Sequence, residues 1–215
     1  MTDNTLKQAV LDELKWEPSV NEAHIGVTAR DGVVALTGDV DSYSEKLAAE
    51  RAAGRVLGVK GVAQDLKVRY PFDNKVDDAD IARKAIQSLE WNIEVPPNKV
   101  KVKVEDGWVT LSGTLDWYFQ HGAAAAAVRN LKGVRGVINS ITIKPTARSS
   151  DVRDKIMAAL KRNAQIEADK ITVTTDEGKV TLSGRVDSWG EDSLVVETAW
   201  SAPGVSVVID NLVIA

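Results

Sequence analysis

The chain has 215 residues, of which 44% are apolar and 27% are charged, and its net charge is −4. This composition is ordinary for a globular protein, and the length allows one large domain or two to three small ones. Because the chain contains no cysteine, disulfides, zinc thiolates and thiol catalysis are excluded. The acidic balance also argues against a partner that is a nucleic acid, since backbone binding requires a basic surface.

The N-terminal stretch lacks the pattern of a secretory signal. Charged residues such as Asp3, Lys7 and Asp12 interrupt any apolar core of the required roughly 7–15 residues. No window approaches the roughly 18 consecutive apolar residues of a membrane span. We therefore expect a cytoplasmic protein without a transmembrane segment, or a periplasmic one if a leader was removed.

One stretch of the chain occurs three times. Residues 31–68, 106–143 and 177–214 align without a gap, and their glycines keep common spacings. The repeated glycines are Gly32, Gly107 and Gly178, then Gly38, Gly113 and Gly184, then Gly58, Gly133 and Gly204. The repeat predicts three domains, at residues 1–70, 76–145 and 148–215, joined by short polar linkers.

Each unit begins with a helical pattern followed by a strand pattern. In the first unit the apolar residues Leu6, Val10 and Leu14 step by four, which is typical of an amphipathic helix. Residues 25–29 alternate between apolar and polar, as in a strand with one buried face. The Asp31-Gly32 pair predicts a tight turn into a second, antiparallel strand.

The second half of each unit is a helix and a third strand. Asp41, Asp116 and Asp187 stand before this helix and are expected to be its caps, although a carboxylate ligand for a cation is the alternative. Ser42 with Glu45 has the spacing of a capping box. The third glycine of each unit is expected to end the helix in a left-handed conformation.

The predicted fold class is α+β. Since a helical crossover joins the second and third strands, those strands are expected to run parallel. The chain should therefore form three tandem α-β-β-α-β units, each a three-stranded mixed sheet with two helices on one face.

The repeated pattern resembles the BON domain (bacterial OsmY and nodulation domain). The resemblance is carried by residues 32–40, 107–115 and 178–186, which read G-x-V-x-L-x-G-x-V with small departures, and by the glycine-led ends of the units. It covers nearly the whole chain. It implies a phospholipid-interacting or envelope-maintenance module linked to osmotic stress, and one relative in the family binds potassium. The third unit departs from the pattern, with Val207 where Gly61 and Gly136 stand.

No catalytic constellation repeats between the units. His24 and His121 do not align with each other, so a transition-metal site is not expected and no Ser/His/Asp set can be proposed. We expect no cofactor and no enzymatic activity.

Lysines form a stripe in the middle unit. Lys99, Lys101 and Lys103 alternate with valines, so they should share the outer face of a strand, and Trp108 should stand on the same face of the next strand. Residues 73–146 hold ten Lys/Arg and nine Asp/Glu, which makes this the least acidic unit. The stripe suits anionic headgroups, but a solvated sheet face or a contact between units gives the same pattern.

Three consecutive aromatic residues open the second helix of the middle unit. Trp117, Tyr118 and Phe119 cannot all face one core, because successive helical positions point about 100° apart. They suit a membrane or partner surface, and equally a contact with a neighbouring unit. Trp16 and Trp91, which close the first helices, could act in the same way.

The leading hypothesis is a non-enzymatic, stress-related binding module whose middle unit contacts anionic phospholipid or a protein partner. The lipid or partner surface would consist of Lys99, Lys101, Lys103, Trp108, Trp117, Tyr118 and Phe119. Two alternatives are a sensor of a cation such as potassium or of a small ligand, and a structural adaptor that acts through oligomerisation.

Overall fold

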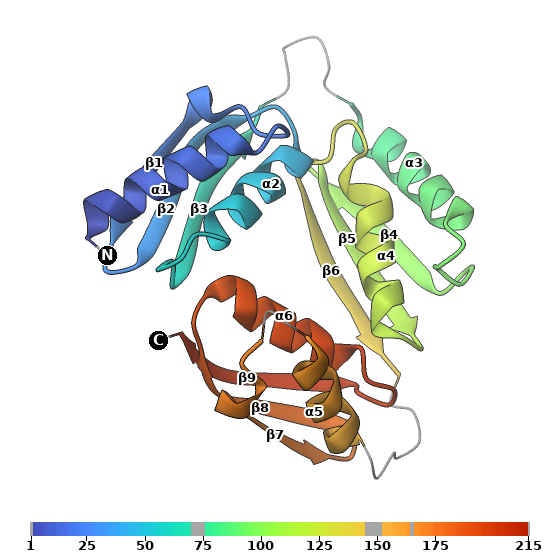
Figure 1. The fold of residues 1–215 in the computed structure, drawn as a ribbon. Coiled ribbons are helices and arrows are strands. Elements are labelled where there is room, and N and C mark those ends of the chain that lie inside the picture. The colour runs from blue at the N-terminus through green and yellow to red at the C-terminus, as the bar shows by residue number, and fades with distance from the viewer. Residues whose placement is uncertain (1, 70–75, 145–151, 164–165, 215) are drawn as a thin grey trace.

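The computed structural model describes residues 2–69, 76–144, 152–163 and 166–214. These residues form three units in tandem, and each unit contains one three-stranded sheet (Figure 1). The expected α+β class and three-unit organisation are confirmed. The predicted linkers lie largely outside the described residues.

Each unit has the element order helix, strand, strand, helix, strand, and two units add a short 3₁₀ helix before the first strand. Unit 1 contains α1 (Asp3–Trp16), η1 (Glu22–His24), β1 (Ile25–Arg30), β2 (Val33–Val40), α2 (Tyr43–Gly54) and β3 (Gly61–Val68). Unit 2 contains α3 (Asp78–Trp91), β4 (Val100–Glu105), β5 (Trp108–Leu115), α4 (Tyr118–Arg129) and β6 (Gly136–Ile143). Unit 3 contains α5 (Val152–Arg162), η2 (Ala168–Lys170), β7 (Ile171–Asp176), β8 (Lys179–Val186), α6 (Trp189–Trp200) and β9 (Val207–Ile214).

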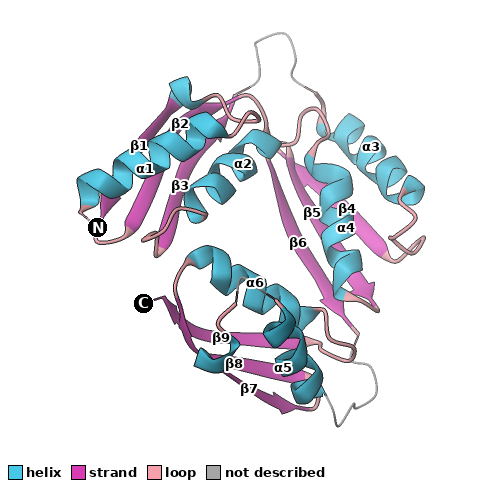
Figure 2. Ribbon diagram, in the orientation of Figure 1, coloured by secondary structure: helices cyan, strands magenta, loops and turns pink. Residues whose placement is uncertain are grey.

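The strands pair as the sequence predicts. In every unit the second strand is central, antiparallel to the first and parallel to the third. The third strand is parallel because a helix carries the chain back across the sheet. Both helices of a unit lie over the same face, and the other face is left uncovered by helices (Figure 2).

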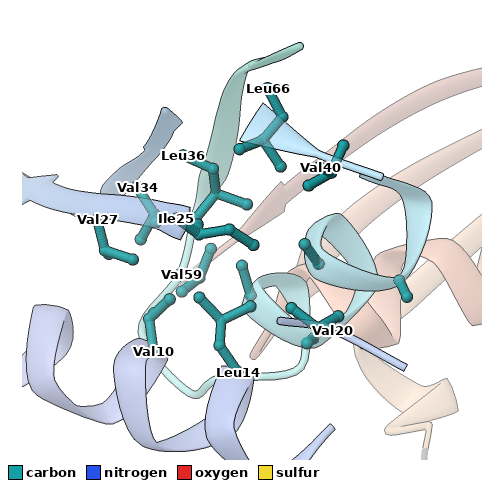
Figure 3. Packing of buried hydrophobic residues seen from close by; sticks show 14 of the residues in the cluster. Val10, Leu14, Val20, Ile25, Val27, Val34, Leu36, Val40, Val59 and Leu66 are labelled. Atoms are coloured by element: carbon teal, nitrogen blue, oxygen red, sulfur yellow. The ribbon is translucent and has the colours of Figure 1, made fainter. Parts of the chain in front are cut away.

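The core of each unit lies between the helices and the covered face of the sheet. In unit 1 the predicted stripe of α1, including Val10 and Leu14, is fully buried. Figure 3 shows these side chains packed with Val34 and Leu36 of the central strand. The apolar residues that recur every four positions on the helix and every two positions on the strands thus pack together in one layer.

Two glycine positions explain why the unit repeats so faithfully. Asp31 and Gly32 both have positive φ, 52° and 84°, as the two-residue type I′ hairpin turn requires. At Gly113, φ is 146° and an added Cβ would lie 2.1 Å from the carbonyl oxygen of Lys99. Only glycine can therefore bring β4 and β5 this close at that point. All nine repeated glycines have positive φ.

The expected helix caps are corrected by one residue. The N-caps are Ser42, Trp117 and Ser188, and the aspartates at 41, 116 and 187 precede them. In unit 1 the Ser42 hydroxyl accepts the N–H of Glu45 at 3.1 Å, and the Glu45 carboxylate accepts the N–H of Asp41 at 2.8 Å. This is the predicted capping box. It uses the backbone of Asp41, so the Asp41 side chain is not the cap.

The expected helix ends are also corrected. Helix α2 ends at Gly54 and is followed by Arg55. Gly58 instead lies inside the next turn, in which the N–H of Val59 donates to the carbonyl of Val56 at 3.1 Å. The left-handed conformation expected of this glycine is present, with φ of 91°, but it serves the turn toward β3.

Candidate interaction surface of the middle unit

The lysine stripe lies at the edge of the unit 2 sheet. Lys99 directly precedes β4, and Lys101 and Lys103 stand on it opposite Ser112 and Thr110. All three lysines are exposed. Lys103 donates to Glu105 at 2.8 Å, and this hydrogen bond raises the pKa of Lys103. The positive charge of Lys103 is therefore partly balanced by the Glu105 carboxylate, whereas the described structure gives Lys99 and Lys101 no ion pair.

Trp108 lies at the other end of this sheet from Lys99. It pairs with Glu105, the last residue of β4, and its ring crosses Gly136, where an added Cβ would lie 2.3 Å from the ring. The glycine of β6 is therefore needed to seat this ring. In unit 3, Lys179 and Val207 occupy the two positions, and no such ring has to be accommodated.

The ring of Trp108 lines a cleft of about 790 Å³ between units 1 and 2. Arg135 and Lys67 also line this cleft. Trp108 thus shares the open face of the sheet with Lys101 and Lys103 but belongs to a different surface at its far end.

Two of the three consecutive aromatic residues are exposed at the same end of unit 2 as Lys99. Strands β4 and β5 are antiparallel and Val100 pairs with Gly113, so Lys99 and the segment after β5 lie at the same end of the sheet. Trp117 and Phe119 are both exposed there. The sheet register therefore places Lys99 and this aromatic segment at the same end of unit 2, although they are about 20 residues apart in the sequence.

Tyr118 points elsewhere. Its ring stacks on that of His121, with centroids 5.3 Å apart, and on that of Trp200 in unit 3, with centroids 4.6 Å apart. Burial raises the pKa of Tyr118, and the charge of Glu197 adds to the effect. The sequence left two alternatives for the aromatic segment, a membrane or partner surface and a contact with a neighbouring unit. Tyr118 makes the contact with a neighbouring unit.

Two further apolar side chains are exposed at the same end of unit 2. Trp91, the last residue of α3, is 80% exposed, and Ile93 in the following loop is 100% exposed. The sequence predicts Trp91 as a candidate contact residue but does not predict Ile93. Ile93 is an isolated branched apolar residue between Asn92 and Glu94, outside any periodic pattern.

We define the α3–β4 surface as the exposed residues at the end of unit 2 where β4 begins: Trp91, Ile93, Lys99, Lys101, Trp117 and Phe119. The lysines lie toward the open face of the sheet, and the aromatic residues lie at the ends of the helices. The α3–β4 surface combines exposed apolar side chains with free ammonium groups. Elsewhere, the pKa of His121 is lowered by burial. Within the described part of the chain, no three His, Asp or Glu side chains gather as a metal site would require.

Comparison with known proteins identifies the fold. A model of the BON domain matches residues 2–70, 77–145 and 148–215. The chain belongs to the BON domain family. Osmotically-inducible protein Y of Escherichia coli is 31% identical over 149 residues, which span 67% of this chain and 74% of that protein. A 21 kDa hemolysin of Actinobacillus pleuropneumoniae is 31% identical over 142 residues, which span 65% of this chain and 73% of the hemolysin.

Among solved structures, two of CdsD, a structural protein of the type III secretion system of Chlamydia trachomatis, align with this BON protein at 17% identity. The first match covers 98% of this chain and 92% of the other with a TM-score of 0.28, and the second covers both chains fully with a TM-score of 0.27. These scores are too low to bear on the function. Across the described residues, no helix has the length and apolar character needed to span a membrane.

Proposed function

We propose that this BON protein is a non-enzymatic module of an osmotic-stress response that binds anionic phospholipid surfaces through its α3–β4 surface. The observation that carries the proposal is the exposure of Ile93 (100%) and Trp91 (80%) at the end of unit 2 that also carries Lys99 and Lys101, which have no ion pair in the described structure. The relationship to an osmotically inducible protein supports the physiological setting.

The chemistry of the α3–β4 surface matches that of a membrane interface. Tryptophan is favoured at the headgroup level, where its ring meets both apolar and polar surroundings. Each lysine near an acidic leaflet contributes about 1 kcal/mol, so Lys99 and Lys101 together contribute about 2 kcal/mol. Transfer of Ile93 out of water adds about 1.5–3 kcal/mol if the side chain becomes fully buried.

The test is flotation of the full chain with vesicles of phosphatidylcholine alone or mixed with phosphatidylglycerol. We expect binding only to the mixed vesicles, and less binding at high salt because added ions screen exposed charges. The double change Lys99→Glu and Lys101→Glu should weaken binding roughly 30-fold or more, since about 2 kcal/mol of attraction is lost.

The matched control changes the same charge elsewhere. Lys161→Glu with Arg162→Glu alters exposed residues at the end of α5 in unit 3 and should leave binding near the wild-type level. Ile93→Ser should weaken binding about tenfold, whereas Leu57→Ser, at an exposed apolar residue of unit 1, should not. Equal binding by the Lys99/Lys101 variant and its control would refute the assignment of this surface.

A further inference from the structure

The second helices of the three units begin with an aromatic residue at equivalent positions. Tyr43, Tyr118 and Trp189 are the first residues of α2, α4 and α6. Each of them contacts another unit. Tyr43 packs against the buried core of unit 2, Tyr118 stacks on a residue of unit 3, and Trp189 packs against the core of unit 1. The three contacts therefore run from unit 1 to 2, from 2 to 3, and from 3 back to 1.

The receiving residues of the second and third contacts are equivalent as well. Trp200, on which Tyr118 stacks with ring planes 9° apart, is the last residue of α6. Gly54 is the last residue of α2, and an added Cβ on it would lie 3.0 Å from the ring of Trp189. In both of these contacts the start of one second helix meets the end of another. Figure 1 shows α2, α4 and α6 arranged around the middle of the molecule, with the start of α2 turned toward unit 2.

Two physical features make these contacts specific. Head-to-tail helices place the positive end of one helix dipole near the negative end of another, which is favourable. The sizes of the partners are also matched, because the larger ring of Trp189 meets Gly54, while the smaller ring of Tyr118 stacks flat on Trp200. A different pairing of the same ends would leave a void or a clash.

We propose that these helix ends form one type of joint, used three times, that closes the three BON units into an intramolecular ring. The partner that fits the free end of each second helix is the second helix of another unit of this chain. The joint between α6 and α2 closes the ring, because units 3 and 1 are not adjacent in the sequence. Tethering gives the ends an effective concentration on the order of mM, so closure within one chain outcompetes pairing between chains at μM protein.

The test is cross-linking of the full chain across the closing joint. Arg51 of α2 and Ser193 of α6 line the same groove of about 380 Å³ beside Trp189, and the natural chain has no cysteine. In the Arg51→Cys/Ser193→Cys variant, a short bismaleimide should link the two cysteines within one chain. The yield should not depend on protein concentration.

The yield should fall about fivefold or more when Trp189→Glu is added, because ring packing is lost while an acidic residue at a helix start keeps α6 stable. Trp16→Glu, at a tryptophan that is 83% exposed, is the matched control and should leave the yield unchanged. Gly54→Gln approaches the same joint from unit 1 and should also lower the yield, which keeps the test valid if the Trp189 variant fails to fold. An unchanged yield in both joint variants, or links formed mainly between chains, would overturn the proposal.

Discussion

Replacing Asp210 by asparagine should stabilise unit 3 at neutral pH. The position is equivalent to Asn139 of unit 2, whose Nδ2 donates to the carbonyl of His121 at 2.8 Å while its Oδ1 accepts the N–H of Ile141. Asp210 keeps the second bond, since its Oδ1 accepts the N–H of Leu212 at 2.9 Å. The other carboxylate oxygen of Asp210 takes the place of the Asn139 Nδ2 group. It cannot donate a hydrogen bond as that group does, and it faces Asp192 of α6.

The pKa of Asp192 reports this conflict. Burial raises it from the usual 3.8 to about 6, and the charge and hydrogen bond of Asp210 add to the shift. Among the described residues, Asp210 is the charged side chain that adds to this shift. Because the folded state binds this proton more tightly than the unfolded chain does, the stabilisation is fully present below pH 3.8. It is lost as the pH rises through about 6.

The magnitude follows from the shift. A rise in pKa of about two corresponds to about 3 kcal/mol of stability for a fully buried group. Asp192 is only partly buried, so solvent screening reduces this contribution to about 1 kcal/mol. Asp210→Asn leaves the burial of Asp192 in place and removes only the part of the shift that comes from Asp210. It should therefore raise the free energy of unfolding of unit 3 by about 1 kcal/mol at pH 7.5, counting the restored hydrogen bond. At pH 4 the gain should nearly vanish, because a shared proton then supplies the donor.

The assay is urea unfolding at pH 4, 6 and 7.5, with hydrogen exchange of α6 to isolate unit 3. Asp176→Asn removes one negative charge from an exposed position of the same unit and should lack this pH dependence. The reciprocal change Asn139→Asp should destabilise unit 2 by about 1 kcal/mol at pH 7.5, because it removes a donor. If the wild type and Asp210→Asn lose stability equally between pH 4 and 7.5, the two carboxyls do not share a proton.

Two further changes test the frame of the units. Gly113→Ala should lower the free energy of unfolding by about 3 kcal/mol or more, since its Cβ would lie 2.1 Å from the Lys99 carbonyl oxygen at positive φ. Gly122→Ala in α4 has open space and should raise the free energy of unfolding by about 0.5–1 kcal/mol. Thermal melts in which both variants shift in the same direction would contradict this. Glu45→Gln should cost about 1–3 kcal/mol and speed exchange of the Asn21 amide, because the nearly buried carboxylate uses one oxygen for the N–H of Asn21 and the other for that of Asp41. Unchanged exchange at Asn21 would show that this bond does not hold the loop before β1.

The unit and its repetition follow from local patterns in the sequence. Alternating valines, helical steps of four and Asp-Gly turns are local patterns, and each follows from backbone geometry within a few residues. The predicted cap is Asp41, whereas the structure shows Ser42. Both residue types cap helices, and only hydrogen-bond geometry distinguishes them.

The use of each unit's surface depends on how the three units pack together. Sequence spacing predicted that Trp117, Tyr118 and Phe119 could not share one environment, but it could not tell which one meets another unit. That choice depends on the relative placement of units 2 and 3, which brings Trp200 to Tyr118. The same holds for Trp189 and Gly54, which are 135 positions apart in the chain. The aromatic residue at the start of the second helix does recur in every unit, as Tyr43, Tyr118 and Trp189. Its spacing could not show which unit it would meet, because that depends on how the folded units are placed relative to one another.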